Sequence, residues 1–264
     1  MPDDSPPLLD LARVRAALEG TRFADVRAVG TTASTNDDVA PLLGDPSAAG
    51  TTLVAEVQTA GRGRKPGRSW IAPAGSALLF TVVLPVAVRT EALWAVPFWA
   101  ALALADGVEE GCGVRLELRW PNDADLAGRK AAGILCTSRV VGAEAYVGCG
   151  IGLNVHRPSD SAVAAIVPPP AYLTDAAPRV EREVVLAGIL GAMDGLVDAL
   201  HRPNEIAHAW EERAELRGRP YRVRMDADGS LVEGTALRLD DDGGLVLAVA
   251  GGERSVHLAD ARVV

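Results

Sequence analysis

The sequence is poor in cysteine and in aromatic side chains. It contains 3 cysteines in 264 residues, and phenylalanine, tryptophan and tyrosine together make up 4%. An odd number of cysteines without the spacing of a metal site predicts reduced thiols in a reducing compartment, and it excludes a scaffold built on disulfides. Valine, leucine, isoleucine and alanine must therefore supply most of the core.

Positive charge is also in short supply. There are 26 lysines and arginines against 35 aspartates and glutamates, which gives a net charge of −9. Nucleic-acid binding needs a dominant basic face, so we expect no nucleic acid among the partners. The hydrophobic fraction of 48% and the charged fraction of 23% are those of a globular protein.

No segment predicts secretion or a membrane span. Residues 1–7 (MPDDSPP) lack the basic and apolar regions of a signal peptide. The longest apolar stretch, from Ala92 to Val108, is interrupted by Pro97 and Asp106 and is short for a bilayer. We expect a buried helix there, no membrane partner and a cytoplasmic protein.

Up to about residue 216 the chain alternates between helical and strand-like patterns. Apolar residues at helical spacing predict helices over 8–18, from Ser34 onward, 91–109, 181–200 and 204–216. Short β-rich runs predict strands over 23–29, 51–57, 76–84, 114–120, 132–140 and 145–151. The proline-rich residues 156–180 are expected to be irregular.

After Gly218 the pattern changes to short strands separated by tight turns. The strand-like runs YRVRM, LVEGTALRL, GLVLAVA and RSVHL are separated by Asp-Gly and Gly-Gly pairs. This pattern predicts a small β-barrel. We expect a domain over residues 1–216 and a second one over 217–264.

Four cations and three glycines are concentrated in the loop Gly61–Arg68. Glycines let the backbone and its N–H groups approach a ligand, and guanidinium groups match carboxylate and phosphate oxygens. A solvated basic loop is an equal alternative when the loop is taken alone. Its spacing matches neither a Walker A loop nor a dinucleotide-binding loop.

Two further segments carry polar residues at the ends of predicted strands. Asn122 and Asp123 follow one strand and by themselves predict an ordinary turn. Lys130 stands at the entrance of an apolar strand, where a lysine either extends to solvent or holds an anion.

Three alternate glycines, Gly148, Gly150 and Gly152, lie in one predicted strand. Glycine weakens a strand unless something approaches it closely, and tight packing against a helix explains the pattern as well as a ligand does. Ser34, followed by Thr35, Asn36 and two aspartates, predicts an N-cap with a capping box.

Taken together and in this order, these segments resemble the biotin–protein ligase family. The segments are STN (34–36), QTAGRGR (58–64), GRSW (67–70), RWPND (119–123), RKAAGIL (129–135) and GCGIGLNV (148–155). In the family loop one residue stands where this chain has Lys65 and Pro66, so the match of Arg68 needs an insertion. Arg119 stands where many members have lysine.

The resemblance implies an α/β (α+β) fold. It consists of a mixed-sheet, class II synthetase-like catalytic domain followed by a small SH3-like β-barrel. It also implies a two-step reaction in which biotin and ATP, with Mg²⁺, give biotinyl-5′-AMP, and the biotinyl group then passes to a lysine of a biotin carboxyl carrier protein domain. We expect a monomer or a weak homodimer.

By residue-wise match, the resemblance also implies the site. Lys130 and Arg64 would be catalytic, and Asp123 would serve Mg²⁺. The biotin-binding residues would be Ser34, Thr35, Asn36, Gln58, Gly61, Arg62, Gly63, Arg64, Lys130, Gly133 and Gly150. The ATP-binding residues would be Arg64, Arg68, Trp70, Arg119, Asn122, Lys130 and Asn154.

Three alternatives stay open at this point. A lipoate–protein ligase or octanoyltransferase would share the fold and the chemistry. A DNA-binding regulator would use the basic loop, although about thirty residues before Ser34 are too few for a winged-helix domain, so a monofunctional ligase is expected. An inactive relative would bind biotin alone.

Overall fold

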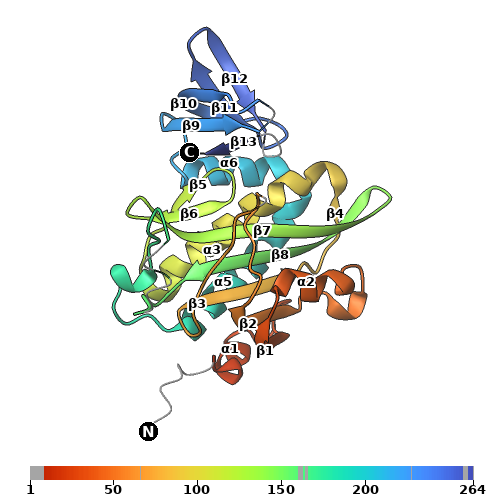
Figure 1. The fold of residues 1–264 in the computed structure, drawn as a ribbon. Coiled ribbons are helices and arrows are strands. Elements are labelled where there is room, and N and C mark those ends of the chain that lie inside the picture. The colour runs from red at the N-terminus through yellow and green to blue at the C-terminus, as the bar shows by residue number, and fades with distance from the viewer. Residues whose placement is uncertain are drawn as a thin grey trace.

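The computed structural model describes residues 9–65, 67–159, 163, 166–226, 228–257 and 261–263. Its larger part is a mixed sheet of eight strands in the order β1-β2-β3-β8-β7-β6-β5, with β4 paired to β8 (Figure 1). The strands are β1 (Val26–Thr32), β2 (Thr52–Gln58), β3 (Ala77–Val83), β4 (Val88–Arg89), β5 (Glu117–Arg119), β6 (Asp123–Leu126), β7 (Arg129–Val141) and β8 (Glu144–Asn154). β1 and β2 are parallel and the other pairs are antiparallel, so the predicted mixed sheet is confirmed.

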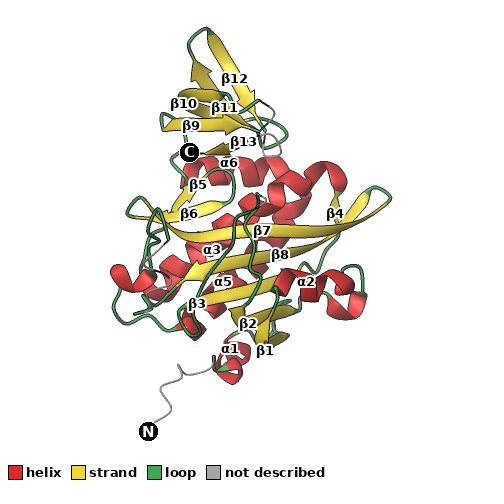
Figure 2. Ribbon diagram, in the orientation of Figure 1, coloured by secondary structure: helices red, strands yellow, loops and turns green. Residues whose placement is uncertain are grey.

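Helices cover the two faces of this sheet unequally (Figure 2). The α-helices are α1 (Leu11–Ala17), α2 (Thr35–Val39), α3 (Val96–Cys112), α5 (Arg182–Leu196) and α6 (Pro203–Arg213). Short 3-10 helices are η1 (Ala40–Leu42), η2 (Pro46–Ala48), η3 (Thr90–Ala95), η4 (Leu173–Asp175) and η5 (Val197–His201). The long helices α3 and α5 lie on one face, and the short helix α2 lies on the other.

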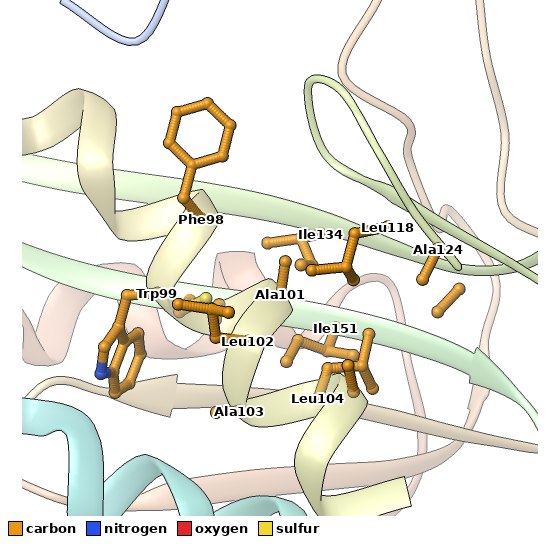
Figure 3. Close-up of a cluster of buried hydrophobic side chains, with 14 of the residues drawn as sticks. Phe98, Trp99, Ala101, Leu102, Ala103, Leu104, Leu118, Ala124, Ile134 and Ile151 are labelled. Carbon is orange, nitrogen blue, oxygen red and sulfur yellow. The ribbon is translucent and has the colours of Figure 1, made fainter. Parts of the chain in front are cut away.

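Helix α3 forms the centre of the hydrophobic core. Its side chains Ala101, Leu102 and Leu104 lie beside Ile134 of β7 and Ile151 of β8 (Figure 3), while Phe98 packs against Trp94 and Trp210. The predicted buried helix is thus confirmed, and Gly113 ends it in the left-handed conformation with φ +71°. Two segments are long and apolar enough to span a membrane by length and composition alone: Thr90–Cys112 and Arg182–His201. In the first segment, 72% of the apolar 18-residue stretch is buried inside the protein.

Helices α3 and α5 approach each other through glycines. A Cβ built on Gly107 would lie 2.3 Å from the backbone nitrogen of Ile189, and one built on Gly188 would lie 2.7 Å from the carbonyl oxygen of Gly107. No side chain fits between the two backbones at these points. The pairing of the two helices, and with it the position of the sheet above them, depends on the missing Cβ atoms.

The second sheet is antiparallel, with five strands in the order β12-β11-β10-β9-β13. Its strands are β9 (Pro220–Met225), β10 (Leu231–Leu239), β11 (Leu245–Val249), β12 (Gly252–Val256) and β13 (Ala261–Val263). Trp120 joins it to the first sheet, because its Nε1 donates to the Gly243 carbonyl at 3.0 Å and its backbone N–H donates to the Tyr221 hydroxyl at 3.3 Å.

The sequence pattern missed three strands, the two-residue β4, β6 and β13. Asp123 was expected in a turn, but the turn ends at Asn122 and Asp123 is the first residue of β6. The aspartates of this short strand are typical of turns, and only the pairing with β5 and β7 makes it a strand. The remaining expected strands and helices are present at or close to the predicted ranges.

We predict that Gly107→Ala lowers the free energy of unfolding by about 1–3 kcal/mol, because the added methyl group forces α3 and α5 apart. Gly191→Ala is the matched control, since Gly191 lies in α5 with open space at its Cβ position. It should raise the stability by up to about 1 kcal/mol through helix propensity. Urea unfolding measures both, and equal stability of Gly107→Ala and wild type would contradict the packing.

Candidate functional site

A cleft opens on the face of the large sheet that carries α2. It encloses about 500 Å³ of empty space, including the part open to solvent. Its walls come from α2, from the ends of β2 and β7, from β8 and from the loop 61–70. The lining residues are Ser34, Thr35, Asn36, Gln58, Arg62, Gly63, Arg64, Trp70, Phe80, Asn122, Lys130, Gly133, Ile134, Leu135, Gly150, Ile151 and Gly152.

The alternate glycines of β8 form the floor under this cleft. A Cβ on Gly150 would lie 2.5 Å from the Oδ1 atom of Asn36, and one on Gly152 would lie 2.6 Å from the Trp70 ring. A Cβ on Gly148 would touch Val39 at 3.0 Å. The packing interpretation of the glycines is therefore confirmed, because the strand packs closely against α2; Gly150 and Gly152 also line the cleft.

The start of α2 is held by β2 and not by its own side chain. Ser34 occupies the N-cap position but makes no side-chain capping hydrogen bond, so the predicted capping box is wrong. Instead the backbone N–H of Thr35 donates to Oε1 of Gln58 at 2.8 Å. Ser34, Thr35 and Asn36 all line the cleft.

Asn36 is fixed by two strands below it. Its Nδ2 donates to the Leu135 carbonyl of β7 at 2.9 Å, and its Oδ1 lies 2.9 Å from the hydroxyl of Thr81 in β3. Thr81 is fully buried and also lies 2.7 Å from the Thr35 hydroxyl. Sequence reasoning missed Thr81, because a threonine in an apolar strand gives no signal until α2 is seen above it.

The cation loop 61–69 has hairpin hydrogen bonds at its base. The Gly63 N–H donates to the Arg68 carbonyl at 2.8 Å, and the Trp70 N–H donates to the Gly61 carbonyl at 2.9 Å. The Arg62 guanidinium pairs with both oxygens of Asp37 in α2, with Nη1 2.8 Å from Oδ2. This ion pair fastens the loop to α2, and it lowers the pKa of the Asp37 carboxyl.

Arg64 and Lys65 connect the loop with more distant parts of the chain. Arg64 lines the cleft. Burial lowers the pKa of its guanidinium group, although the nearby charges of Asp123 and Asp226 act in the opposite direction and raise it. An arginine remains protonated in spite of such a shift. Lys65 pairs through Nζ with Asp226, which follows β9 in the second sheet. Pro66, the other residue of the apparent insertion, lies outside the described residues.

Lys130 lies at the entrance of β7, as predicted, and at the edge of the cleft. Its Nζ is 2.6 Å from Oδ1 of Asp123 and lies 5.7 Å from the centre of the Trp70 ring. The side chains of this ion pair are 43% and 33% exposed, so solvent screens the attraction between them. The ammonium group can therefore exchange its carboxylate for another anion.

Five predicted residues do not line the cleft: Gly61, Arg68, Arg119, Asp123 and Asn154. Arg119 pairs with Asp125 of β6 and lies over the Tyr221 ring. Asn154 is buried and donates to the Ala171 carbonyl at 3.1 Å. Asp123 reaches the edge of the cleft through Lys130.

Five lining residues were absent from the prediction: Phe80, Ile134, Leu135, Ile151 and Gly152. Gly152 belongs to the alternate glycines and could have been included on that signal. The other four are apolar residues of β3, β7 and β8. Their place at the cleft follows only from the order of the strands.

The cleft has two chemically different ends. Asn36 of α2 lies over Gly150, whereas Lys130 and Trp70 lie over Gly133, which pairs with Gly152 two residues further along β8. Hydroxyl and amide groups thus gather at α2, and Lys130 and Arg64 supply positive charge near Asp123. Such an arrangement suits an elongated ligand with a neutral polar head and an anionic tail.

Among the described residues no group of three or more histidine, cysteine, aspartate or glutamate side chains could hold a metal ion.

Comparison with known proteins gives a consistent result. The profile of the biotin/lipoate A/B protein ligase family matches residues 32–154. The chain is 33% identical to the biotin–[acetyl-CoA-carboxylase] ligase of Paracoccus denitrificans over 87% of this chain and 96% of that protein. The resemblance seen in the sequence motifs is thereby confirmed.

Other similar proteins include a longer one and one of known structure. The bifunctional ligase/repressor of Bacillus spizizenii is 30% identical over 80% of this chain, which spans 65% of the length of that relative. The structure of the biotin protein ligase of Aquifex aeolicus in complex with biotin and ATP superimposes with a TM-score of 0.73. It covers 92% of this chain and 99% of the other at 21% identity, which is a likeness of fold.

We predict that Gly150→Ala lowers the free energy of unfolding by about 1–3 kcal/mol and displaces Asn36, because the new methyl group would overlap its side-chain amide. Gly30→Ala in β1 is the matched control, since a Cβ there meets no atom within 4 Å. Urea unfolding reports the stability, and the side-chain amide resonance of Asn36 reports the displacement. An unmoved Asn36 resonance in Gly150→Ala would contradict the close approach.

Proposed function

The chain belongs to the biotin–protein ligase family, and we propose on that premise that it activates biotin with ATP and transfers it to a lysine of a biotin carboxyl carrier protein domain. The observation that carries the proposal is a cleft that brings neutral polar groups of α2 together with the cations Lys130 and Arg64. These are the two kinds of group that biotin presents, a neutral ureido ring and a carboxylate.

In the first step the biotin carboxylate attacks the α-phosphorus of ATP. A new phosphorus–oxygen bond forms, the bond to the β-phosphate bridge oxygen breaks, and pyrophosphate leaves. One anion attacks another, so catalysis depends on positioning and on cations that stabilise the developing charge. Lys130 would bridge the carboxylate and the α-phosphate, and Arg64 would hold the biotinyl-5′-AMP that results.

In the second step the neutral amine of a carrier lysine attacks the carbonyl carbon of the mixed anhydride. A carbon–nitrogen bond forms, the carbon–oxygen bond to AMP breaks, and the amine loses a proton. The protein has to protect the anhydride from water until the carrier arrives. The loop 61–69, which Arg62 fastens to α2, would cover it from one side.

The nucleotide would lie beyond Lys130, toward the edge strands of the sheet. Trp70 and Asn122 line the cleft there, and Nδ2 of Asn122 donates to the Ile134 carbonyl at 2.7 Å. We keep Arg68, Arg119 and Asn154 as nucleotide contacts from the family motifs alone, since they do not line the cleft.

Mg²⁺ would enter bound to the phosphates of ATP. Mg²⁺ keeps several waters and usually takes one or two carboxylates, so a cage of protein ligands is not required. The described residues fit this mode, because Asp123 supplies one carboxylate beside Lys130. When bound, the ion would offset phosphate charge.

Several finer features are part of the same proposal. The second sheet would form an SH3-like barrel over residues 217–264, separate from the catalytic domain over 1–216; its five short antiparallel strands support this. We propose a cytoplasmic location, supported by the free thiols of Cys112, Cys136 and Cys149, and a monomer or weak homodimer. A net charge of −9 supports the absence of sequence-specific DNA binding.

The direct test is biotinylation of a carrier domain. The protein is incubated with biotin, MgATP and a biotin carboxyl carrier domain, and the mass of the carrier is measured. The proposal predicts a shift by one biotinyl group that requires ATP. Modification by lipoate but not by biotin would support the lipoate–protein ligase instead, which the named biotin ligase relatives do not favour.

We predict that Lys130→Ala lowers the rate of adenylate formation at least a hundredfold while the protein stays folded. A charge-assisted contact of this kind contributes on the order of 3 kcal/mol in the transition state. The control is Arg129→Ala, which removes the neighbouring cation that pairs with Asp175 outside the cleft. Biotin-dependent pyrophosphate exchange is the assay, and a wild-type rate in Lys130→Ala would refute the assignment.

We also predict that Arg64→Gly still forms biotinyl-5′-AMP but releases it early. Arg64 is the half-buried cation of the loop that reaches the cleft, so its loss removes the contact that would retain the intermediate. Labelling of lysines on an unrelated bystander protein should increase several-fold over wild type. If bystander labelling stays at the wild-type level, Arg64 does not retain the adenylate.

A further inference from the structure

Thr81 lies directly under the neutral end of the cleft, although it does not line it. It is in the middle of β3, opposite Gly150 in the sheet, and is 0% exposed. Its hydroxyl oxygen is 2.7 Å from the Thr35 hydroxyl and 2.9 Å from Oδ1 of Asn36. A buried hydroxyl in contact with two residues of the cleft can determine what those residues offer to a ligand.

The direction of each hydrogen bond follows from the groups at the ends of the network. The Leu135 carbonyl can only accept, so the Asn36 amide must point its Nδ2 there and its Oδ1 toward Thr81. Oδ1 cannot donate, and we assign the single proton of the Thr81 hydroxyl to Asn36 because that contact has no other donor.

The remaining contact with Thr35 then has one solution. Since the Thr81 proton is committed to Asn36, the 2.7 Å contact needs the Thr35 hydroxyl as its donor. Oε1 of Gln58 accepts from the Thr35 backbone N–H at 2.8 Å and lies 3.1 Å from the Thr35 hydroxyl, with no hydroxyl proton left for that contact. Thr35 Oγ1 and Gln58 Oε1 are therefore both acceptors.

We propose that Thr81 is a positioning residue that fixes the Thr35 hydroxyl as a hydrogen-bond acceptor, so that the cleft selects a ligand head that donates an N–H. The inference rests on the proposed function, in which that head is the ureido ring of biotin. A ring that carries sulfur atoms and no N–H cannot donate to Thr35 Oγ1, so it covers this hydroxyl oxygen without replacing its hydrogen bond to water, which is costly.

The test compares two buried threonines on adjacent strands. Thr81→Val keeps the shape of the side chain and removes the hydroxyl. Thr52→Val in β2 is the matched control, since Thr52 is equally buried and its hydroxyl has no hydrogen-bond partner among the described residues. Calorimetry with biotin alone and with ATP alone gives the dissociation constants, and steady-state kinetics separates KM from kcat.

Thr81→Val should raise the Kd and the KM for biotin about tenfold or more, with the Kd for ATP unchanged. Thr81→Ser, which restores the hydroxyl, should recover most of the affinity, and Thr52→Val should bind biotin as wild type does. In a Thr35→Val background, Thr81→Val should cost little further affinity, because it acts through Thr35. If Thr81→Val does not fold, Thr81→Ala removes the same hydroxyl without adding bulk.

Two failures are distinguishable. If the wild-type protein does not bind biotin, the proposed function is wrong and this inference falls with it. If wild type binds biotin and both Thr81→Val and Thr81→Ala bind it equally well, or if Thr81→Ser loses as much affinity as Thr81→Val, the proposed function stands and the role of Thr81 is overturned.

Discussion

The close approach of side chains to the glycines of β8 is the constraint on which the cleft depends. Asn36 from α2 and Trp70 from the end of the cation loop both lie where a Cβ on Gly150 or Gly152 would be. With any other residue at these positions, α2 and the loop would have to move away from the sheet. The depth of the cleft and the placement of its polar groups thus follow from atoms that the strand lacks.

On this floor, the two ends of the cleft are organised in different ways. The neutral end is a network of hydrogen bonds that connects Thr35, Thr81 and Asn36 with β7. The charged end has cations held beside carboxylates, such as Lys130 by Asp123, and these pairs are partly exposed. Exposed ion pairs contribute little, so an arriving phosphate or carboxylate can replace the aspartate at small cost. The first end is suited to selecting a ligand and the second to exchanging anions.

Sequence reasoning predicted the parts of the site that show locally. The alternate glycines, the cation loop and the lysine at a strand entrance are patterns within a few residues, and 12 of the 17 lining residues were among those predicted. It could not predict Thr81, the pairing of Arg62 with Asp37 or the link from Lys65 to Asp226, because each joins segments far apart in the chain. It missed β6 for a different reason, because the aspartates of this short strand are typical of turns.

The central claim is that one ligand spans both ends of the cleft, with its polar head on α2 and its anionic end at Lys130. The most direct measurement is a crystal structure of the protein with biotinyl-5′-AMP. The account predicts a ureido N–H within hydrogen-bond distance of Thr35 Oγ1 and Lys130 Nζ in contact with the acyl phosphate, away from Asp123. An adenylate bound elsewhere, or one in this cleft with its ureido ring away from α2, would contradict it.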